Sequence, residues 1–386
     1  MAPIIIIGSG MAGYTVAREF RKRNRQTPLT IISRDCGSFY AKPMLSNAFQ
    51  QGKDTAGLVN FTAEQMAAQL DATILSHTEV EAIQPNSRSV TLTGRRLPYS
   101  ALVLAVGADQ RQLKLDGDGA ADVMTVNDLA DYGRFRQALN GIQRVAILGA
   151  GLIGCEFAND LANAQFEVSL VDPAAWPLSR LLPPQAGLAM ADALTGLGVA
   201  LHLGKTPQAI TRRDGGYTLH MADGDTLEVE RMVAAVGLAP RLELARKAGL
   251  LVDRGIVTNA WLYTSAEHVY ALGDCAEVDG LLLPYVMPIM QAARALAKTL
   301  NGEPTRVVYP AMPVVVKTPA LPAVIVPPLL SDGRWEAAEA LQAEGIVTGM
   351  RAVYTNQQEE VCGFALLGDC IKEKGVLLKT LEPWRP

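Results

Sequence analysis

The sequence predicts an α/β fold in which one strand–turn–helix unit occurs twice and a smaller domain follows. An apolar run ends in a glycine-rich turn at residues 4–13, which read IIIIGSGMAG, and again at residues 146–156, which read AILGAGLIGCE. A third segment, HVYALGDCAEV at residues 268–278, contains an apolar run that ends at Gly273 and Asp274. Apolar runs of this length beside helical periodicity are typical of buried parallel strands. We therefore expect two Rossmann-like dinucleotide-binding domains and a smaller C-terminal α+β domain.

Length and composition exclude several classes of protein. The chain has 386 residues, 49% hydrophobic and 19% charged, so it can bury more than one core. Its formal net charge of −4 argues against nucleic-acid binding, and no run approaches the roughly 20 apolar residues of a membrane helix. The apolar start runs directly into a glycine turn, unlike an export signal. The five scattered cysteines favour a reducing, cytoplasmic setting, and neither they nor the four histidines have metal-ligand spacing.

The first turn has the spacing of a dinucleotide-binding fingerprint. Gly8 permits the tight turn, Gly10 lets the backbone approach a pyrophosphate, and Gly13 lets the following helix pack on its strand. The amino end of that helix then favours the negative charge of the phosphates. A glycine-rich turn can also serve packing alone, so its place in the chain has to decide between the two interpretations.

The second turn repeats this spacing with Gly149, Gly151 and Gly154, and its second strand ends at Asp172. A carboxylate at that place accepts hydrogen bonds from a ribose 2′-hydroxyl and repels a 2′-phosphate, which predicts NADH over NADPH. The alternative is a solvated acid at a strand end. The first unit has no clean equivalent of this acid, and its polar residues there are Ser33, Arg34 and Asp35.

The order of these segments resembles the FAD- and NAD(P)H-dependent pyridine nucleotide-disulfide reductase superfamily over about residues 1–310. The resemblance implies that the first unit binds FAD, that the second binds the nicotinamide nucleotide, and that Asp274 holds the ribityl-pyrophosphate region of FAD. The expected domains are an FAD-binding domain of residues 1–108 and 238–308, an NAD-binding domain of residues 109–237, and a C-terminal α+β domain of residues 309–386.

The region that carries reactive cysteines in many members of this superfamily has no cysteine pair here. It reads RDCGSFYAKPMLSNAF at residues 34–49, with Cys36 alone, and we interpret Cys36 as a small hydrophobe rather than a reactive thiol. The segment YAKPMLSNAF instead resembles the reductases of small iron carriers, and rubredoxin reductases most closely. This resemblance implies that Lys42 lies against FAD and that Pro43 fixes the backbone beside the flavin. A surface lysine beside a rigid turn is the alternative.

Many ferredoxin-reducing relatives have a lysine where this chain has Asn47, and that lysine pairs with a glutamate near the flavin. Glu156 matches the glutamate, so we expect its partner charge to be absent here. Glu156 also lies in the first turn of a helix, where the dipole alone favours a carboxylate, so a structural role is equally open. No catalytic acid or base is obligatory, and Glu156 is the one candidate.

Two later segments bear on the flavin. Residues 283–302 are expected to become helical near Ile289, which aims a helix amino end at the flavin and makes Pro288, Met290 and Gln291 contacts. Residues 312–328 resemble the start of the C-terminal domain of rubredoxin reductases and contain Lys317, which either extends to solvent or reaches the cofactor. Residues 359–369 are expected to form a later strand of that domain.

The fingerprints and the resemblance together predict two sets of contacts. Those with FAD are Gly8, Ser9, Gly10, Ala12, Gly13, Ser33, Arg34, Lys42, Pro43, Val80, Ala105, Gly107, Asp274, Val286, Met290 and Lys317. Those with NAD(H) are Gly149, Gly151, Ile153, Gly154, Glu156, Asp172 and Gly237.

The expected reaction is hydride transfer from NADH to FAD, followed by release of single electrons to the iron of rubredoxin without a redox disulfide. The alternatives are a reductase of ferredoxin or flavorubredoxin, an NADH oxidase, or a sensor that binds FAD and NADH. Alkane degradation and oxygen detoxification both fit as pathways. We expect a monomer with a locally positive docking face for an acidic carrier. Candidate segments for that face are residues 17–25, 294–306 and 372–385.

Overall fold

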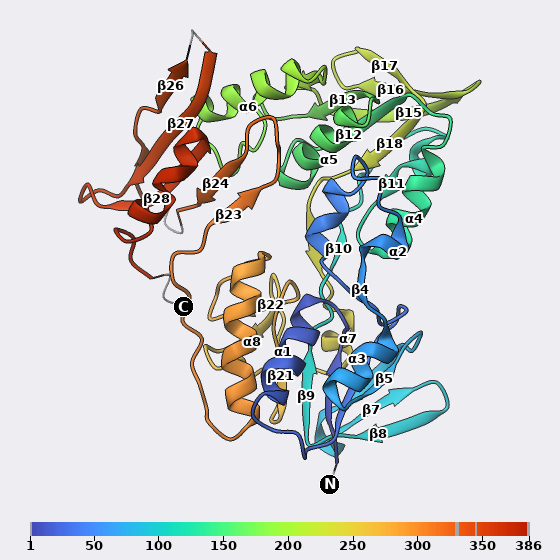
Figure 1. Ribbon diagram of the computed structural model, residues 1–386. Helices are drawn as coiled ribbons and strands as arrows, with labels where there is room; N and C mark the ends of the chain where they lie inside the picture. Colours follow the sequence, from blue (N-terminus) through green and yellow to red (C-terminus); the bar gives the residue numbers. More distant parts are fainter. Residues whose placement is uncertain (1, 329–331, 344–345, 384–386) are drawn as a thin grey trace.

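The computed structural model describes residues 2–328, 332–343 and 346–383. It contains two five-stranded sheets, a short ribbon that joins them, and an antiparallel sheet near the C-terminus (Figure 1). This arrangement confirms the predicted α/β class with a smaller C-terminal α+β domain.

The first sheet is parallel, and its strands come from both ends of the first 310 residues. In spatial order they are β21 (Val269–Ala271), β9 (Ala101–Leu104), β1 (Ile4–Ile7), β2 (Leu29–Ile32) and β5 (Thr73–Leu75). All four isoleucines of β1 are buried, as expected of a central parallel strand covered on both faces. Because β21 pairs with β9, the chain returns to this sheet after it has built the second one.

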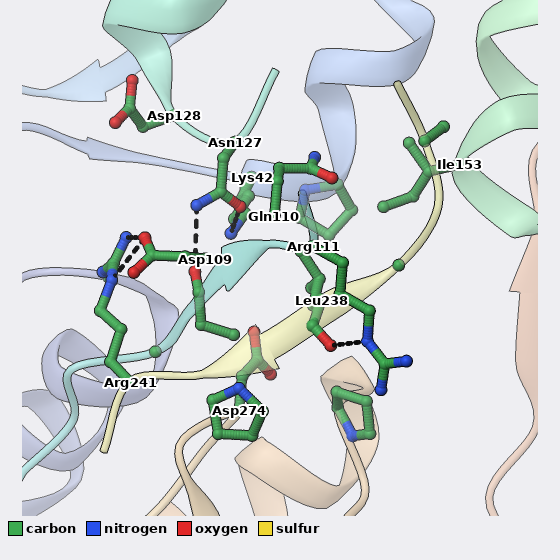
Figure 2. Close-up of a pocket in the computed structure, with 18 of the residues that line it drawn as sticks. Lys42, Asp109, Gln110, Arg111, Asn127, Asp128, Ile153, Leu238, Arg241 and Asp274 are labelled. Atoms are coloured by element: carbon green, nitrogen blue, oxygen red, sulfur yellow. Dashed lines mark hydrogen bonds and ion pairs between the residues drawn. The ribbon is translucent and has the colours of Figure 1, made fainter. Parts of the chain in front are cut away.

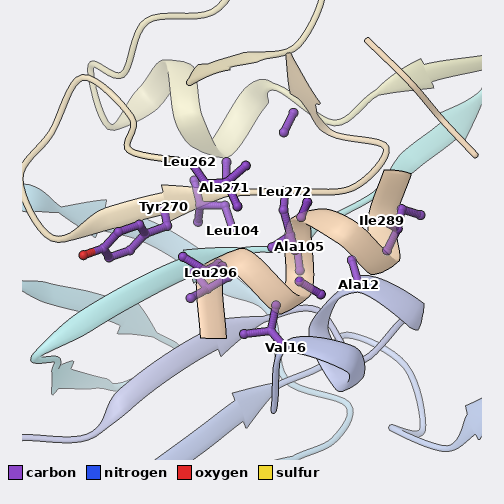
Figure 3. Close-up of a cluster of buried hydrophobic side chains, with 14 of the residues drawn as sticks. Ala12, Val16, Leu104, Ala105, Leu262, Tyr270, Ala271, Leu272, Ile289 and Leu296 are labelled. Atoms are coloured by element: carbon purple, nitrogen blue, oxygen red, sulfur yellow. The ribbon is translucent and has the colours of Figure 1, made fainter. Parts of the chain in front are cut away.

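Helices α1 (Met11–Arg21) and α8 (Val286–Leu300) pack together beside this sheet. Figure 3 shows Val16 of α1 and Leu296 of α8 meeting below Leu104 of β9. Both helical side chains are fully buried, and burial of each contributes about 1.5–3 kcal/mol. Helix α8 begins at Val286 rather than near Ile289, because a proline lacking the backbone N–H is tolerated in the first turn of a helix.

The second sheet is also parallel. Its strands in spatial order are β11 (Met124–Thr125), β18 (Arg231–Ala234), β12 (Arg144–Leu148), β13 (Glu167–Asp172) and β14 (Ala200–Leu203). The helices of this part are α4 (Leu129–Ala138), α5 (Leu152–Asn163) and α6 (Pro184–Gly196). A separate cluster of buried residues, including Ile147, Phe157 and Leu170, forms its core. Each of the two glycine-turn units therefore packs on its own hydrophobic core.

The two sheets are joined by a two-stranded antiparallel ribbon, which we call the crossing ribbon. It consists of β10 (Ala108–Gln110) and β19 (Leu238–Pro240), with Asp109 directly opposite Ala239. Gly107 and Gly237 precede the two strands with φ of +71° and +100°, values that favour glycine. Each time the chain passes between the sheets it does so through this ribbon (Figure 1).

The C-terminal sheet is antiparallel. Its path is β23 (Val314–Val316), β24 (Ala323–Val326), β28 (Val361–Gly368), β27 (Ile346–Thr355) and β25 (Arg334–Trp335), and β26 (Glu339–Ala343) also pairs with β27. The short helices η4 (Asp369–Glu373) and α9 (Lys374–Leu377) follow. Strand β28 lies within residues 359–369, where a strand was expected. Residues 329–331, 344–345 and 384–386 of the expected domain lie outside the described part.

Smaller elements complete the fold. The remaining sheets are β3 (Phe39–Tyr40) with β4 (Val59–Phe61), β6 (Val80–Gln84) with β7 (Ser89–Leu92) and β8 (Arg95–Pro98), β15 (Pro207–Arg213) with β16 (Gly216–Met221) and β17 (Thr226–Val229), and β20 (Ile256–Thr258) with β22 (Ala276–Val278). The remaining helices are η1 (Lys42–Asn47), α2 (Thr55–Leu58), α3 (Ala63–Leu70), η2 (Pro85–Ser87), η3 (Ala120–Asp122) and α7 (Glu243–Lys247). Among the described residues, no helix combines the length and apolar character needed to cross a membrane.

Candidate functional site

A cavity of about 2070 Å³ lies between the two sheets and reaches both glycine turns. Both strands of the crossing ribbon and one end of the C-terminal sheet also line it. Every residue predicted to contact FAD or NAD(H) lines this cavity except Gly13, Gly154, Pro288, Met290 and Gln291. Residues chosen from segments far apart in the sequence are therefore brought together in one site.

The first glycine turn leaves room for a phosphate where the fingerprint requires it. A Cβ on Gly8, whose φ is +115°, would lie 2.2 Å from the carbonyl oxygen of Ala105. A Cβ on Gly13 would lie 2.0 Å from the carbonyl oxygen of Gly8, so Gly13 serves helix packing and does not face the cavity. A Cβ on Gly10 would meet nothing within 4 Å, which leaves the backbone there open to a ligand.

The second glycine turn has the same geometry. A Cβ on Gly149 would lie 2.7 Å from the carbonyl oxygen of Ala235, and one on Gly154 would lie 1.8 Å from that of Gly149. The position of Gly151 is open, like that of Gly10. Both turns thus end in a helix amino terminus that faces one cavity, the arrangement that binds the pyrophosphate of a dinucleotide.

Acidic side chains follow both turns but are held differently. The carboxylate of Asp172 accepts the backbone N–H of Ala150 at 2.6 Å and of Ala174 at 2.7 Å. In the first unit Asp35 accepts the hydroxyl of Ser33 at 2.5 Å, and the hydroxyl oxygens of Ser33 and Ser9 are 2.5 Å apart. The backbone therefore holds the Asp172 carboxylate directly at its glycine turn. The Asp35 carboxylate is linked to the first turn by the hydroxyls of Ser33 and Ser9.

Lys42 and Asp274 face the centre of the cavity (Figure 2). The Nζ of Lys42 donates to Oδ1 of Asn127 at 2.7 Å, and Nδ2 of Asn127 donates to the carbonyl oxygen of Ala108 at 3.0 Å. Burial lowers the pKa of Lys42, and the Asp274 carboxylate opposes that shift. Burial likewise raises the pKa of Asp274, which Lys42 and Arg241 oppose. Lysine and aspartate thus stabilise each other's charged form across the cavity.

Asn127 and Arg241 were not predicted from the sequence. Arg241 donates to Oδ1 of Asp109 from Nε at 2.8 Å and from Nη2 at 2.5 Å, and this pair lowers the pKa of Asp109. Arg34 also approaches Asp109, at 3.5 Å. Asn127 lies 85 residues from Lys42, so only the fold brings the two together.

The expectation that Glu156 lacks a partner charge is wrong. Glu156 is only 1% exposed, and its Oε2 accepts Nζ of Lys317 at 3.0 Å. It also accepts the hydroxyl of Ser46 at 2.5 Å and the backbone N–H of Lys317 at 2.8 Å. Asn47, which stands where many relatives have the lysine, accepts Nζ of Lys317 at 2.6 Å. The cation comes from Lys317, directly after β23 of the C-terminal sheet, and its Nζ bonds to Glu156 and Asn47.

The amino end of α8 reaches the cavity through residues other than most of those expected. Val286 lines the cavity, whereas Pro288 is buried outside it. The sulfur of Met290 accepts the hydroxyl of Thr15 at 3.7 Å, so Met290 belongs to the contact between α1 and α8. Gln291 also lies outside the cavity lining. Met287 and Ile289 of α8 line the cavity instead of these three residues.

Cysteines and metal ligands are absent from the site. Cys36 is exposed and lies outside the cavity lining, and no other cysteine of the described residues lines it either. Burial raises the pKa of the Cys275 thiol to about 11, which keeps it protonated. In the described part of the chain, no group of three or more acidic, histidine or cysteine side chains is arranged to hold a metal ion.

Comparison with known proteins agrees with this geometry. The model of the pyridine nucleotide-disulphide oxidoreductase family matches residues 2–298, and that of the rubredoxin binding C-terminal domain matches residues 306–381. A rubredoxin-NAD(+) reductase of Alcanivorax borkumensis is 46% identical over 388 residues, covering 100% of both chains. One of Acinetobacter baylyi is 47% identical over 392 residues, covering 99% of this chain and 98% of the relative.

Among solved structures, a ferredoxin reductase from Rhodopseudomonas palustris superposes with a TM-score of 0.89 at 24% identity, covering 99% of this chain and 96% of that one. At that identity the likeness concerns the fold alone. The full-length relatives and the two matched domains go further: the chain belongs to the pyridine nucleotide-disulphide oxidoreductases and, within them, to the rubredoxin-NAD(+) reductases.

Proposed function

We propose that this enzyme passes electrons from NADH through FAD to the iron of rubredoxin, one electron at a time and without a redox disulfide. The observation that carries the proposal is the single cavity that joins both glycine turns and is lined by no cysteine of the described residues. FAD, when bound, supplies the chemistry that accepts a hydride and releases single electrons. The match of residues 306–381 to a rubredoxin binding domain supports the identity of the carrier.

The proposed FAD site is the half of the cavity beside the first sheet. The open backbone at Gly10 and the amino end of α1 would hold the pyrophosphate, with Lys42 and Asp274 along the ribityl region. The half beside the second sheet would take NADH, with Gly151 at its pyrophosphate and Asp172 at the adenosine ribose. The corresponding domains are residues 1–108 with 238–308, residues 109–237, and residues 309–386.

Glu156 and Lys317 are proposed to shape the place where the two halves meet. A buried carboxylate beside the flavin would oppose its reduction, because reduced flavin gains negative charge. The ion pair at 3.0 Å neutralises that carboxylate, and Nζ of Lys317 also bonds to Asn47 and to the carbonyl oxygen of Pro43. Lys317 therefore places its ammonium group at the cavity wall beside the Glu156 carboxylate. We further propose a cytoplasmic monomer.

Anaerobic stopped-flow spectroscopy tests the proposed function. The FAD-loaded protein is reduced with NADH and then mixed separately with oxidised rubredoxin, oxidised ferredoxin and air. We expect rapid flavin reoxidation with loss of the rubredoxin colour, and slow reoxidation with the other two. A reduced complex that persists with all three acceptors would instead favour a sensor, and faster reaction with ferredoxin would replace the carrier.

The Cys36→Ser variant serves as the control for a thiol relay. Because Cys36 is exposed and lies outside the cavity lining, the variant is expected to reduce rubredoxin at the wild-type rate. Loss of reduction with full FAD content would show that a thiol takes part.

A further inference from the structure

The backbone of the crossing ribbon is arranged with a local two-fold symmetry, but the charged side chains on its two strands differ. Asp109 lies opposite Ala239, and the strands are closed by matching backbone bonds: Arg111 N–H donates to Gly237 O at 2.9 Å and Arg241 N–H to Gly107 O at 3.1 Å. Each arginine thus stands four residues after the glycine that begins its own strand and beside the glycine of the other strand.

The side chains obey the same symmetry near the glycines. A Cβ on Gly107 would lie 3.9 Å from Nη1 of Arg241, and a Cβ on Gly237 would lie 4.0 Å from Cδ of Arg111. Gly107 and Gly237 line the same cavity, the first at the end of the FAD-side sheet and the second at the end of the NAD-side sheet. Arg241 is therefore the arginine of the FAD half, and Arg111 is that of the NAD half.

The two arginines differ in their counter-ions. Asp109 takes two nitrogens of Arg241, and the third donates to the carbonyl oxygen of Val106 at 2.7 Å. By the two-fold relation Ala239 stands where Arg111 would need an acid. Nε of Arg111 donates to the carbonyl oxygen of Leu238 at 3.0 Å, and Nη1 and Nη2 have no partner among the described residues.

The position of Arg111 indicates which anion it serves. In Figure 2 its guanidinium lies at the other end of the ribbon from the Arg241–Asp109 pair, on the side of Ile153 of α5. Helix α5 begins at the second glycine turn, and Arg111 lines the cavity shared with that turn. A guanidinium with a free pair of nitrogens matches a phosphate group by two parallel hydrogen bonds.

We infer that Arg111 is a positioning residue for NADH, binding the phosphate next to the nicotinamide ribose and holding the nicotinamide end of the molecule beside Gly237. The inference rests on the proposed function and extends it to the nicotinamide half of the substrate. Ala239 makes no contact with NADH in this proposal, but an acid in its place would occupy Arg111 as Asp109 occupies Arg241.

Three variants test this role. Arg111→Gln removes the charge, Ala239→Asp supplies the missing acid, and Ala239→Asn is the matched neutral control. Ala239 is exposed and lies outside the cavity lining, so we expect both substitutions there to leave the fold intact. The visible spectrum of bound FAD checks each preparation.

Titration calorimetry of the oxidised, FAD-loaded protein with NAD+ gives the readout, and AMP is the probe of the adenosine half. Loss of a charge-assisted contact in Arg111→Gln is expected to raise the Kd of NAD+ about tenfold and to leave that of AMP unchanged. Ala239→Asp is expected to raise the Kd of NAD+ about threefold through competition for the guanidinium, and Ala239→Asn not at all. The wild-type affinity for NAD+ should also fall more steeply with salt than that of Arg111→Gln.

An unchanged Kd of NAD+ in both Arg111→Gln and Ala239→Asp would overturn the inference. An equal loss for AMP would overturn it as well, because it would mean a general disturbance of the second glycine turn. A raised KM for rubredoxin with an unchanged Kd of NAD+ would assign Arg111 to the carrier instead. No acceptor is present in the titration, so a failure of the proposed rubredoxin reduction would be seen separately.

Discussion

The two glycine turns share a backbone but differ in what their helices carry. Both have an open central glycine, Gly10 or Gly151, and both face one cavity. Two residues after its last fingerprint glycine, however, α1 carries Thr15, whereas α5 carries the buried Glu156. Four residues further on, α1 has Glu19 in a surface ion pair, and α5 has the buried Asp160.

The dinucleotide fingerprint therefore determines only the turn of each unit, and the rest of each helix is free to differ. Helix α1 packs its outer face on α8 through an apolar contact within its own domain. Helix α5 uses that face to bind other parts of the chain: Glu156 bonds Ser46 and Lys317, and Asp160 accepts the backbone N–H of Phe49 at 2.8 Å and of Gln50 at 3.2 Å. Helix α5 therefore connects its own domain to residues 46–50 and to the C-terminal sheet. We call the contacts of Glu156 with Ser46 and Lys317 the junction.

Substitution of the first glycine in each turn should destabilise the protein most and should affect the two turns differently. Gly8→Ala forces a Cβ to within 2.2 Å of the Ala105 carbonyl oxygen at a φ of +115°, so we expect a loss of about 4 kcal/mol in the free energy of unfolding and a colourless protein. Gly149→Ala, with a contact of 2.7 Å, should stay yellow and lose NADH-dependent flavin bleaching. Absorption spectra before and after NADH addition, with urea unfolding, check both. A Gly149→Ala protein that NADH still bleaches would show that the second turn does not hold NADH.

The second prediction is that Asp160 of α5 makes the free energy of unfolding depend on pH. Burial raises the pKa of Asp160 to about 6, opposed by the N–H groups of Phe49 and Gln50. The folded state therefore keeps the proton after the unfolded state has lost it, so the free energy of unfolding contributed by Asp160 falls as pH rises from about 4 to about 6, by about 3 kcal/mol in all. Urea unfolding from pH 4.5 to 7.5 measures it.

The matched variants for this prediction are Asp160→Asn and Glu19→Gln. The difference in unfolding free energy between wild type and Asp160→Asn should change with pH in that range, while the difference for Glu19→Gln stays level, because Glu19 is paired at the surface. If this difference in unfolding free energy does not change with pH for either variant, the pKa of Asp160 is not raised in the folded protein.

Removal of the cation at the junction should destabilise α5 but not α1. Lys317→Met leaves Glu156 buried without a counter-charge, which we expect to lower the free energy of unfolding by about 2 kcal/mol, since Ser46 and the Lys317 N–H still bond the carboxylate. Thr15→Val, at the equivalent place in α1, should cost less than about 0.5 kcal/mol. The double variant Lys317→Met with Glu156→Gln should recover part of the loss. An equal loss of unfolding free energy in Lys317→Met and Thr15→Val would contradict the proposed difference between α5 and α1.

The smallest effect concerns choice of nucleotide. Asp172→Asn should narrow the preference for NADH over NADPH about tenfold, because the amide no longer repels a 2′-phosphate. Asp35→Asn in the first unit should leave the preference unchanged. Ratios of kcat/KM with ferricyanide as acceptor measure both, and an unchanged ratio in Asp172→Asn would mean that Asp172 does not contact the ribose.

Features set by neighbouring residues were predictable from the sequence. The glycine turns, the acid at the end of β13 and the Gly-Asp after β21 each depend on one strand and its turn, and the structure places them at one cavity. Contacts that depend on the fold as a whole were not predictable. Lys317 and Glu156 are 161 residues apart, so no local pattern distinguishes a lysine that reaches solvent from one that reaches Glu156.

Asp109 and Arg241 show the same limit. They are 132 residues apart, and each looks like an ordinary surface charge until the crossing ribbon sets them side by side. The misplaced Met290 has a local cause, since α8 begins at Val286 and the residues of its first turn, Met287 and Ile289 among them, line the cavity. Errors of this kind follow from a proline inside the first helical turn, which reads in the sequence as a boundary.

The junction at Lys317 sets a rule for building chimaeras from this enzyme. A designer who wishes to change the electron carrier would exchange the C-terminal domain and would naturally cut near residue 309. Such a graft deletes Lys317 along with the domain, and a donor without a lysine at that place leaves Glu156 and Asn47 facing an empty position. Exchanges that begin after Thr318 keep the cation with its carboxylate, so the carrier domain can be varied while the ion pair of Lys317 and Glu156 stays in place.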